Sequence, residues 1–295
     1  MRALLLIAGC VTAPIAAAAS QQKVSVHRAA TPTVSVRLGG ALSSVKIVGW
    51  ERDSIALVGA LGAGSRMDGG AGSASGPVSG MKFFVNAADE ATARGNVLEL
   101  YVPRQARVWV KAGSAVLDAS GITGGLDLNI VGGSVRVNAT PRELLIESMD
   151  GAVTVDGTAG YARIKTATGD ITVLGRAEDL LATTVSGSIT VSGGEVERGR
   201  FESVTGPIVF ASDIRRGGEA RFDTHSGAIE LRLARRADVE IDAASVTGQI
   251  ENGWTSTRPI AGREGRGMEL GTSSGMGGTR VSIRSFKGNV RLTAK

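Results

Sequence analysis

One pentapeptide has the pattern of a serine nucleophile, because Gly271-Thr272-Ser273-Ser274-Gly275 fits G-x-S-x-G. In hydrolases this pattern lies on a sharp turn between a strand and a helix, and a histidine base must lie within hydrogen-bonding distance. The chain has two histidines, His27 and His225, and more glycines rather than a helix follow the pentapeptide. His225 also occupies a repeat position that is otherwise mostly apolar, which favours packing. The sequence therefore argues against a Ser273–His225 hydrolase.

Two pairs of carboxylates stand at equivalent places along the chain. Glu202 and Asp223 each precede a glycine by four residues, and Glu230 and Glu251 each follow one by three. Glycosidases and polysaccharide lyases on coiled β folds gather several carboxylates on one face of adjacent turns. Isolated pairs are more typical of solvated strand residues, so the sequence ranks an enzyme below a binding protein.

Metal and cofactor chemistry has few candidate residues. Cys10 is the only cysteine, the two histidines are far apart in sequence, and neither a calcium-binding glycine–aspartate nonapeptide nor a P-loop occurs. We therefore expect no metal site and no cofactor. Thr154, Thr172 and Thr190 would form one outward file, but three threonines are too few for an ice-binding array.

The C-terminal residues carry the main charge asymmetry. The chain has a formal net charge of +5, whereas residues 252–295 hold eight basic and two acidic side chains. Arg258, Arg263 and Arg266 are candidate contacts to an acidic envelope polymer such as lipopolysaccharide or teichoic acid, and the alternative is a solvated loop. Aromatic side chains that could stack on bases are nearly absent there, so we expect no nucleic-acid partner.

A glycine-centred repeat of 18 to 21 residues organises the chain from about Gly113 onward. A β-branched aliphatic residue stands two places after eight of the glycines, and the alternation that follows predicts a strand with its apolar side inward. Serine or threonine three places before the glycine suits a corner, where we expect glycine to supply a positive φ. The repeat glycines are Gly113, Gly133, Gly151, Gly169, Gly187, Gly206, Gly227, Gly248 and Gly288.

Stacked units of this kind pair their strands in parallel, about 4.8 Å apart, and align the aliphatic columns into one core. We therefore predict an all-β fold, a single-stranded β-solenoid (parallel β-helix) over residues 106–295 with a loop excursion at 252–278. The usual handedness of parallel crossovers favours a right-handed coil, and a triangular left-handed coil is the alternative. The excursion would fold back as a cap before residues 280–292 add the final strands.

The first 105 residues differ from this repeat. Residues 1–19 have the basic, apolar and small-residue regions of a signal peptide, and lipidation of Cys10 is the alternative. No later stretch is long and apolar enough to predict a transmembrane segment in the mature chain. Residues 20–105 predict an N-terminal β-strand region that caps the solenoid, with a mobile Gly-rich loop at 59–80. The strands are expected at 24–36, 45–48, 54–58, 81–85 and 97–102.

Several segments resemble a bacterial family known as a putative adhesin, a domain of unknown function found in envelope and secreted proteins. They are Val45–Asp53 (VKIVGWERD), Leu98–Arg104 (LELYVPR), the repeated S/T-φ-S/T-G-x-φ-x-φ units, and Gly277–Leu292 (GGTRVSIRSFKGNVRL). The resemblance covers most of residues 34–295. It implies a β-solenoid and a noncatalytic envelope protein, and it brings no family site residues.

These features together predict an exported noncatalytic protein that is periplasmic, on the outer surface or secreted. Its partner would be an envelope polysaccharide or another surface protein. A structural or envelope-stress accessory protein that acts through a protein partner is the alternative, and a polysaccharide-active β-helix enzyme is a minor one. The oligomeric state does not follow from the sequence.

Overall fold

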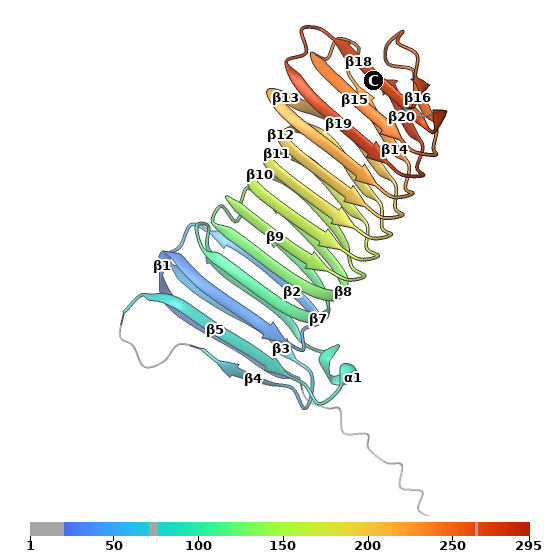
Figure 1. Ribbon diagram of the computed structural model, residues 1–295. Helices are drawn as coiled ribbons and strands as arrows, with labels where there is room; N and C mark the ends of the chain where they lie inside the picture. The colour runs from blue at the N-terminus through green and yellow to red at the C-terminus, as the bar shows by residue number, and fades with distance from the viewer. Residues whose placement is uncertain (1–20, 71–75, 263–264) are drawn as a thin grey trace, which may run out of the picture.

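The computed structural model describes residues 21–70, 76–262 and 265–295 and shows a long rod of stacked strands (Figure 1). The predicted all-β solenoid is confirmed, and one short α-helix, α1 (Glu90–Ala93), lies among the strands of the described residues. The predicted signal peptide and Cys10 lie outside the described residues.

The strands of the N-terminal part are β1 (Gln22–Gly40), β2 (Ser44–Trp50), β3 (Ser54–Leu61), β4 (Arg66–Gly69), β5 (Val78–Asn86) and β6 (Val97–Pro103). The next are β7 (Arg107–Ser120), β8 (Gly125–Ala139), β9 (Glu143–Ser148), β10 (Ala152–Thr166), β11 (Ile171–Thr184), β12 (Ile189–Ser203), β13 (Ile208–Thr224) and β14 (Ile229–Leu233). The last are β15 (Val239–Ser245), β16 (Ile250–Asn252), β17 (Ile260–Ala261), β18 (Met268–Ser274), β19 (Thr279–Ser285) and β20 (Val290–Ala294).

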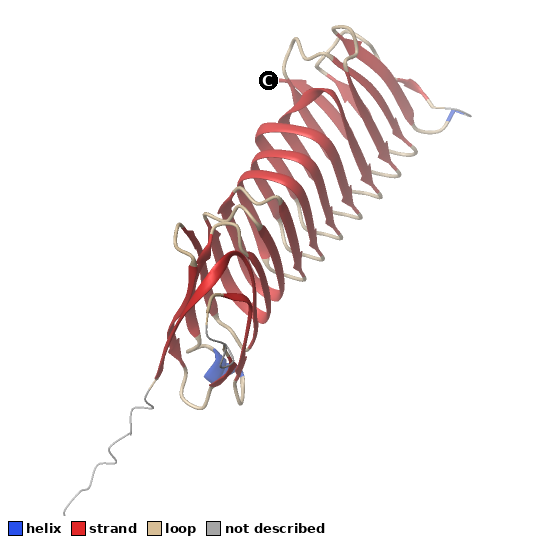
Figure 2. Ribbon diagram, turned by 90° about the vertical axis from the view of Figure 1, so that its left-hand side faces the viewer, coloured by secondary structure: helices blue, strands red, loops and turns tan. Residues whose placement is uncertain are grey.

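Each rung of the rod has one strand on each of two faces, joined at a corner (Figure 2). We call the face before the corner glycine face A and the face after it face B. The inward aliphatic column of face B is confirmed, since Ile171 pairs in register with Val153 and Ile189, and all three are buried. Inside the C-terminal half, Phe201, Phe210 and Phe222 pack with ring centroids 4.9–5.5 Å apart. One continuous core therefore runs the length of the repeat.

The corner glycines are needed for close backbone approach, not for a positive φ as the sequence suggested. Among the nine repeat glycines, all of which the structure describes, only Gly133 has a positive φ, of 101°. A Cβ on Gly206 would lie 1.8 Å from the carbonyl oxygen of Gly187, and one on Gly227 would lie 1.9 Å from that of Gly206. Real Cβ atoms do not approach so closely, so the stacked corners from Gly169 to Gly288 exclude every side chain.

Gly113 does not belong to this column. The register of β7 and β8 pairs Ala112 with Ile130 and Ala115 with Gly133, so Ala115 occupies the corner position. A Cβ on Gly113 would meet no described atom within 4 Å. The glycine spacing from Gly133 back to Gly113 therefore misplaced the first corner by two residues.

The predicted hydroxyl corner is confirmed. Thr166 donates a hydrogen bond through Oγ1 to the carbonyl oxygen of Gly169 at 2.6 Å, and the N–H of Gly227 donates to Oγ1 of Thr224 at 2.9 Å. These side chains are buried and span the turn between the two faces. A second glycine column, which the sequence analysis missed, lines the opposite turns with positive φ at Gly157, Gly175 and Gly194.

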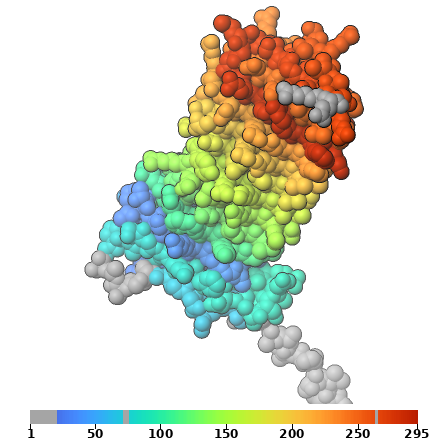
Figure 3. Space-filling view, viewed as in Figure 1, coloured from blue at the N-terminus to red at the C-terminus, as the bar shows by residue number. Residues whose placement is uncertain are grey.

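Parallel stacking already begins inside residues 20–105, where the sequence predicted only a cap. β5 and β6 form one rung. The second half of β1 and the strand β2 form the next rung, which lies between β5–β6 on one side and β7 on the other. Figure 3 shows the blue residues of β1 between cyan and green ones. Part of the expected loop at 59–80 is also ordered, because β4 pairs antiparallel with β5. Residues 71–75 of that loop lie outside the described residues.

Each end of the rod is closed by two consecutive strands that straddle an edge strand, an arrangement that we call a clasp. At the N-terminal end, β2 pairs parallel with one side of β6 and β3 pairs antiparallel with its other side. At the C-terminal end, β19 and β18 flank β15 in the same way. Antiparallel strands thus cover the outer edges of β6 and β15, which would otherwise invite end-to-end pairing.

The C-terminal clasp changes the rung order that the sequence predicted. β19–β20 are not the last rung but lie between β13–β14 and β15–β16, as the red β19 beside β13 shows (Figure 1). The predicted fold-back cap of residues 252–278 is present as β17 and β18, which pair antiparallel beyond β15. Charge favours this order on face B, because Arg291 pairs between Glu230 and Glu251.

We predict that Arg291→Glu destabilises the rod through this charge row. Arg291 Nε lies 2.9 Å from Glu251 Oε2, and Arg232 with Arg291 lowers the pKa of Glu230. Three adjacent carboxylates should lower the free energy of unfolding by about 1–2 kcal/mol, since directly opposed like charges repel. Urea unfolding in about 0.02 M and about 0.5 M salt measures the loss, which should shrink at high salt. Arg291→Gln, which adds no charge, is the control, and equal losses for both variants would contradict the charge argument.

Candidate functional site

A row of exposed apolar side chains follows the corner along most of the rod. These residues stand two places before the corner glycine, and Val185 and Phe286 are 51% and 44% exposed. The sequence suggested that this column packs, and that is wrong because side chains alternate along a strand. The buried hydroxyl column takes the inward position, so its neighbours must point outward. The corner ridge consists of Val131, Met149, Ala167, Val185, Val204, His225, Phe286 and Val246.

An open groove of about 510 Å³ runs beside the C-terminal half of the ridge, on face A. One wall is the ridge from Val204 to Val246, and the floor is the hydroxyl column. The opposite wall consists of the outward residues four places before the glycine, which are Thr183, Glu202, Asp223, Arg284 and Ala244. The groove therefore has one apolar wall and one polar wall.

The predicted carboxylate pair Glu202 and Asp223 is brought together in this groove, in register on neighbouring rungs. Arg200 Nε donates to Glu202 at 2.6 Å, and Arg221 donates to Asp223 through Nε at 2.7 Å and through Nη2 at 3.3 Å. The hydrogen bond to Asp223 raises the pKa of the Arg221 guanidinium. A glycosidase needs one carboxylic acid that donates a proton, whereas both groups here accept hydrogen bonds from arginines. The pair presents fixed hydrogen-bond acceptors.

The other predicted pairs are not brought together. Arg291 separates Glu230 from Glu251. Ser273, in β18, pairs with Glu240 at the end of β15 that is far from the corner. His225 lies at the corner itself, on the ridge. Gly271 is inside strand β18, so the G-x-S-x-G segment is not the strand-to-helix turn that a serine nucleophile requires.

His225 instead forms the centre of the apolar wall. Its ring stacks on Phe286, with centroids 5.0 Å apart and ring planes 18° from parallel. The pairing depends on the clasp, which places β19 next to β13 although about 60 residues separate the two side chains in sequence. Lys287 Nζ lies 6.0 Å from the Phe286 ring centroid. Arg284, on the polar wall, is held by Asp242 through Nη2 at 2.5 Å.

Residues 76–293 match the family model described as Toastrack DUF4097. The chain belongs to this family. The resemblance to an adhesin-like domain of unknown function is thereby confirmed. No curated protein matches the Toastrack chain. A crystal structure of a "putative cell adhesion protein" from Clostridium sporogenes matches it over 94% of this chain and 99% of that chain, with 9% identity and a TM-score of 0.28.

The basic C-terminal stretch of the Toastrack chain is balanced in space by acids from other rungs. Arg284, Arg291 and Lys295 pair with Asp242, Glu251 and Asp213, respectively. Arg258 and Arg266 are exposed beside the C-terminal cap. Arg263, the third predicted polyanion contact, lies outside the described residues.

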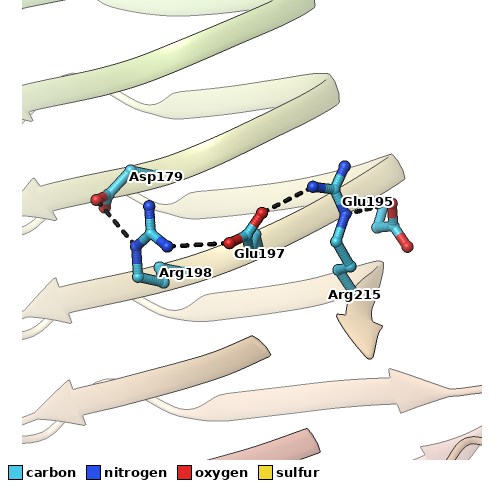
Figure 4. A network of polar contacts seen from close by, with 5 residues as sticks. All are labelled: Asp179, Glu195, Glu197, Arg198 and Arg215. Atoms are coloured by element: carbon cyan, nitrogen blue, oxygen red, sulfur yellow. Dashed lines mark hydrogen bonds and ion pairs between the residues drawn. The ribbon is translucent and has the colours of Figure 1, made fainter. Parts of the chain in front are cut away.

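A chain of ion pairs crosses successive turns on the side of the Toastrack rod opposite the corner (Figure 4). Arg198 contacts Asp179 at 3.3 Å and Glu197 at 3.0 Å, and Arg215 contacts Glu197 at 2.7 Å and Glu195 at 3.3 Å. Exposed pairs of this kind contribute little to stability, because water screens the attraction between the charges. The network ties neighbouring turns together, and two of its members, Asp179 and Arg198, also line an open pocket of about 560 Å³ with Arg142 and Tyr161.

Thr172 pairs in register with Thr154 and Thr190, so the threonine file exists on face B, and Val209 ends it. Among residues 21–70, 76–262 and 265–295, no group of three His, Cys, Asp or Glu side chains could hold a metal ion. Within the same ranges, no helix of the Toastrack chain is long and apolar enough to cross a membrane.

Proposed function

We propose that this Toastrack protein is an exported, noncatalytic binding protein of the adhesion type, active in the periplasm, on the outer surface or in the medium. The observation that carries the proposal is the corner ridge. Contiguous exposed apolar side chains mark interaction sites on soluble proteins, and here they repeat once per rung along a rigid rod. Such a row suits an elongated partner, either an envelope polysaccharide or another surface protein.

Two further features support this function. Residues 1–19 have the composition of a signal peptide. The two carboxylates that share a groove are both engaged by arginines, an arrangement that suits recognition better than proton transfer.

The double variant Met149→Asp/Val185→Asp tests the ridge outside the groove. Both side chains are about half exposed, so the fold should survive, while two charges on an apolar contact should weaken binding at least about tenfold. The measurement is the retention of solubilised envelope fractions by immobilised residues 20–295 across a salt series.

Leu174→Asp is the matched control, because Leu174 is an exposed apolar residue on face B, away from the ridge. Its retention should equal that of the wild type. Equal retention by the ridge variant and the wild type would show that the ridge is not the contact surface.

A further inference from the structure

The groove beside the ridge differs from the rest of the corner in its chemistry. Nearer the N-terminal end, the outward position of face A holds Glu147 and Lys165 on successive rungs. From Thr183 onward the side chains of this wall are either short or held in ion pairs, and the ridge gains the stacked His225 and Phe286. Only this part of the corner combines an aromatic surface with fixed hydrogen-bond acceptors.

The charges of the groove cancel within it. Glu202 and Asp223 are neutralised by Arg200 and Arg221, and Arg284 is neutralised by Asp242. A polyanion entering from solvent would meet Glu202 and Asp223 together with an Arg284 that is already paired, and a cation would find both carboxylates already paired. The groove therefore fits a ligand without net charge.

The polar wall still has unused hydrogen-bonding capacity. An ionised carboxylate offers about four acceptor sites, of which the arginine contacts use one or two. These acceptors are fixed in place by the arginines, so a ligand hydroxyl can donate to them without ordering a mobile side chain. Opposite them, Val204, Phe286 and Val246 offer apolar surface that is 44–46% exposed.

We propose that this groove binds a neutral glycan chain that lies along the rod axis. A pyranose ring presents an apolar C–H face, which would pack on Val204, Val246 and the part of the Phe286 ring that His225 leaves exposed. The hydroxyl groups at its edge would donate to Glu202 and Asp223. Rungs repeat at about 4.8 Å, and an extended chain of pyranose rings advances by a similar length per ring. Successive sugars therefore meet successive rungs. The inference rests on the proposed binding function and names its ligand class.

The test is calorimetric titration of residues 20–295 with neutral hexasaccharides of glucose, xylose, mannose and N-acetylglucosamine, with polygalacturonate as the anionic comparison. At least one neutral glycan should bind, with a Kd on the order of 0.1 mM. Its affinity should change less than about twofold between about 0.05 M and about 0.5 M salt, because no ion pair forms.

Phe286→Ala should weaken that binding at least about tenfold, and Glu202→Gln, which keeps the shape of the side chain, should weaken it about threefold or more. Met149→Ala is the control, since Met149 lies on the same ridge outside the groove and should bind as the wild type does. Glu202→Gln keeps the test decisive if Phe286→Ala perturbs the corner.

Three results would overturn the inference. The first is binding of polygalacturonate alone, lost at high salt, and the second is glycan binding that both groove variants leave unchanged. The third is that no neutral glycan binds, although Met149→Asp/Val185→Asp weakens envelope retention as expected. In that case the proposed binding function would stand, with a protein as the partner. If that ridge variant also retains envelope material normally, the proposed function fails as well.

Discussion

Replacing Ile189 with aspartate is expected to unfold the middle of the rod. Ile189 is fully buried and pairs in register with Ile171 and Ile208, so the new carboxylate would enter an aliphatic column with no counter-charge. An unpaired buried charge should cost on the order of 5 kcal/mol or more, which is comparable to the whole stability of many domains. Because each rung is stable only through its neighbours, several rungs should lose structure together. Urea and thermal denaturation followed by far-UV circular dichroism measure the loss.

Thr190→Asp is the matched control for this variant. Thr190 is the next residue of the same strand and points outward between Thr172 and Val209. Its replacement should change the free energy of unfolding by less than about 1 kcal/mol. A melting temperature for Ile189→Asp within about 2 °C of the wild type would contradict the inward assignment of the column.

Replacing Gly206 with alanine is expected to separate two rungs. The added methyl group would lie 1.8 Å from the carbonyl oxygen of Gly187, so the obstacle is the backbone of the preceding rung. Side-chain repacking cannot relieve this contact, so the strands themselves must shift. We expect a loss of about 3 kcal/mol or more in the free energy of unfolding, measured by urea denaturation.

Gly113→Ala is the corresponding control, because its added methyl group would meet no described atom within 4 Å and its φ is not positive. It should leave stability unchanged or raise it by about 0.4–1 kcal/mol, since alanine restricts the unfolded chain. Similar losses for Gly113→Ala and Gly206→Ala would show that close rung approach is not the reason for glycine at the corner.

The columns of the core could be predicted from sequence because each depends on neighbouring residues. Alternation after the glycine gave the inward position of Ile171 and Ile189, and recurrence every 18 residues aligned them. The same alternation should have placed the ridge outside, because a buried Thr184 forces Val185 outward. Apolar character favoured packing for that column, and this preference misled the prediction. Position within the strand, rather than residue type, decides which side chains are free for a partner.

The order of the rungs could not be predicted in this way. Chain order and the observed order place the same residues in every column, so the repeat contains no information that separates the two orders. The charges distinguish the two orders. Stacking in chain order would pair Glu230 with Glu251, whereas inserting β19–β20 places Arg291 between these two carboxylates. The groove shows the same limit. Glu202 and Asp223 were predicted as equivalent, but Phe286 reaches His225 only because β19 lies beside β13.

The C-terminal clasp means that this rod cannot be completed one rung at a time as the chain leaves the ribosome. β15 and β16 are synthesised before β19 and β20, yet they pair in parallel only with those later strands. During that delay one edge of β14 has no partner strand. β15 and β16 must then either stay unpaired or stack on that edge in the wrong order, which would place Glu251 opposite Glu230. Closing the loop from Ser245 to Ser285 is therefore a late, post-translational step that brings distant residues together. A secreted chain that folds after it has crossed the membrane would meet no such delay.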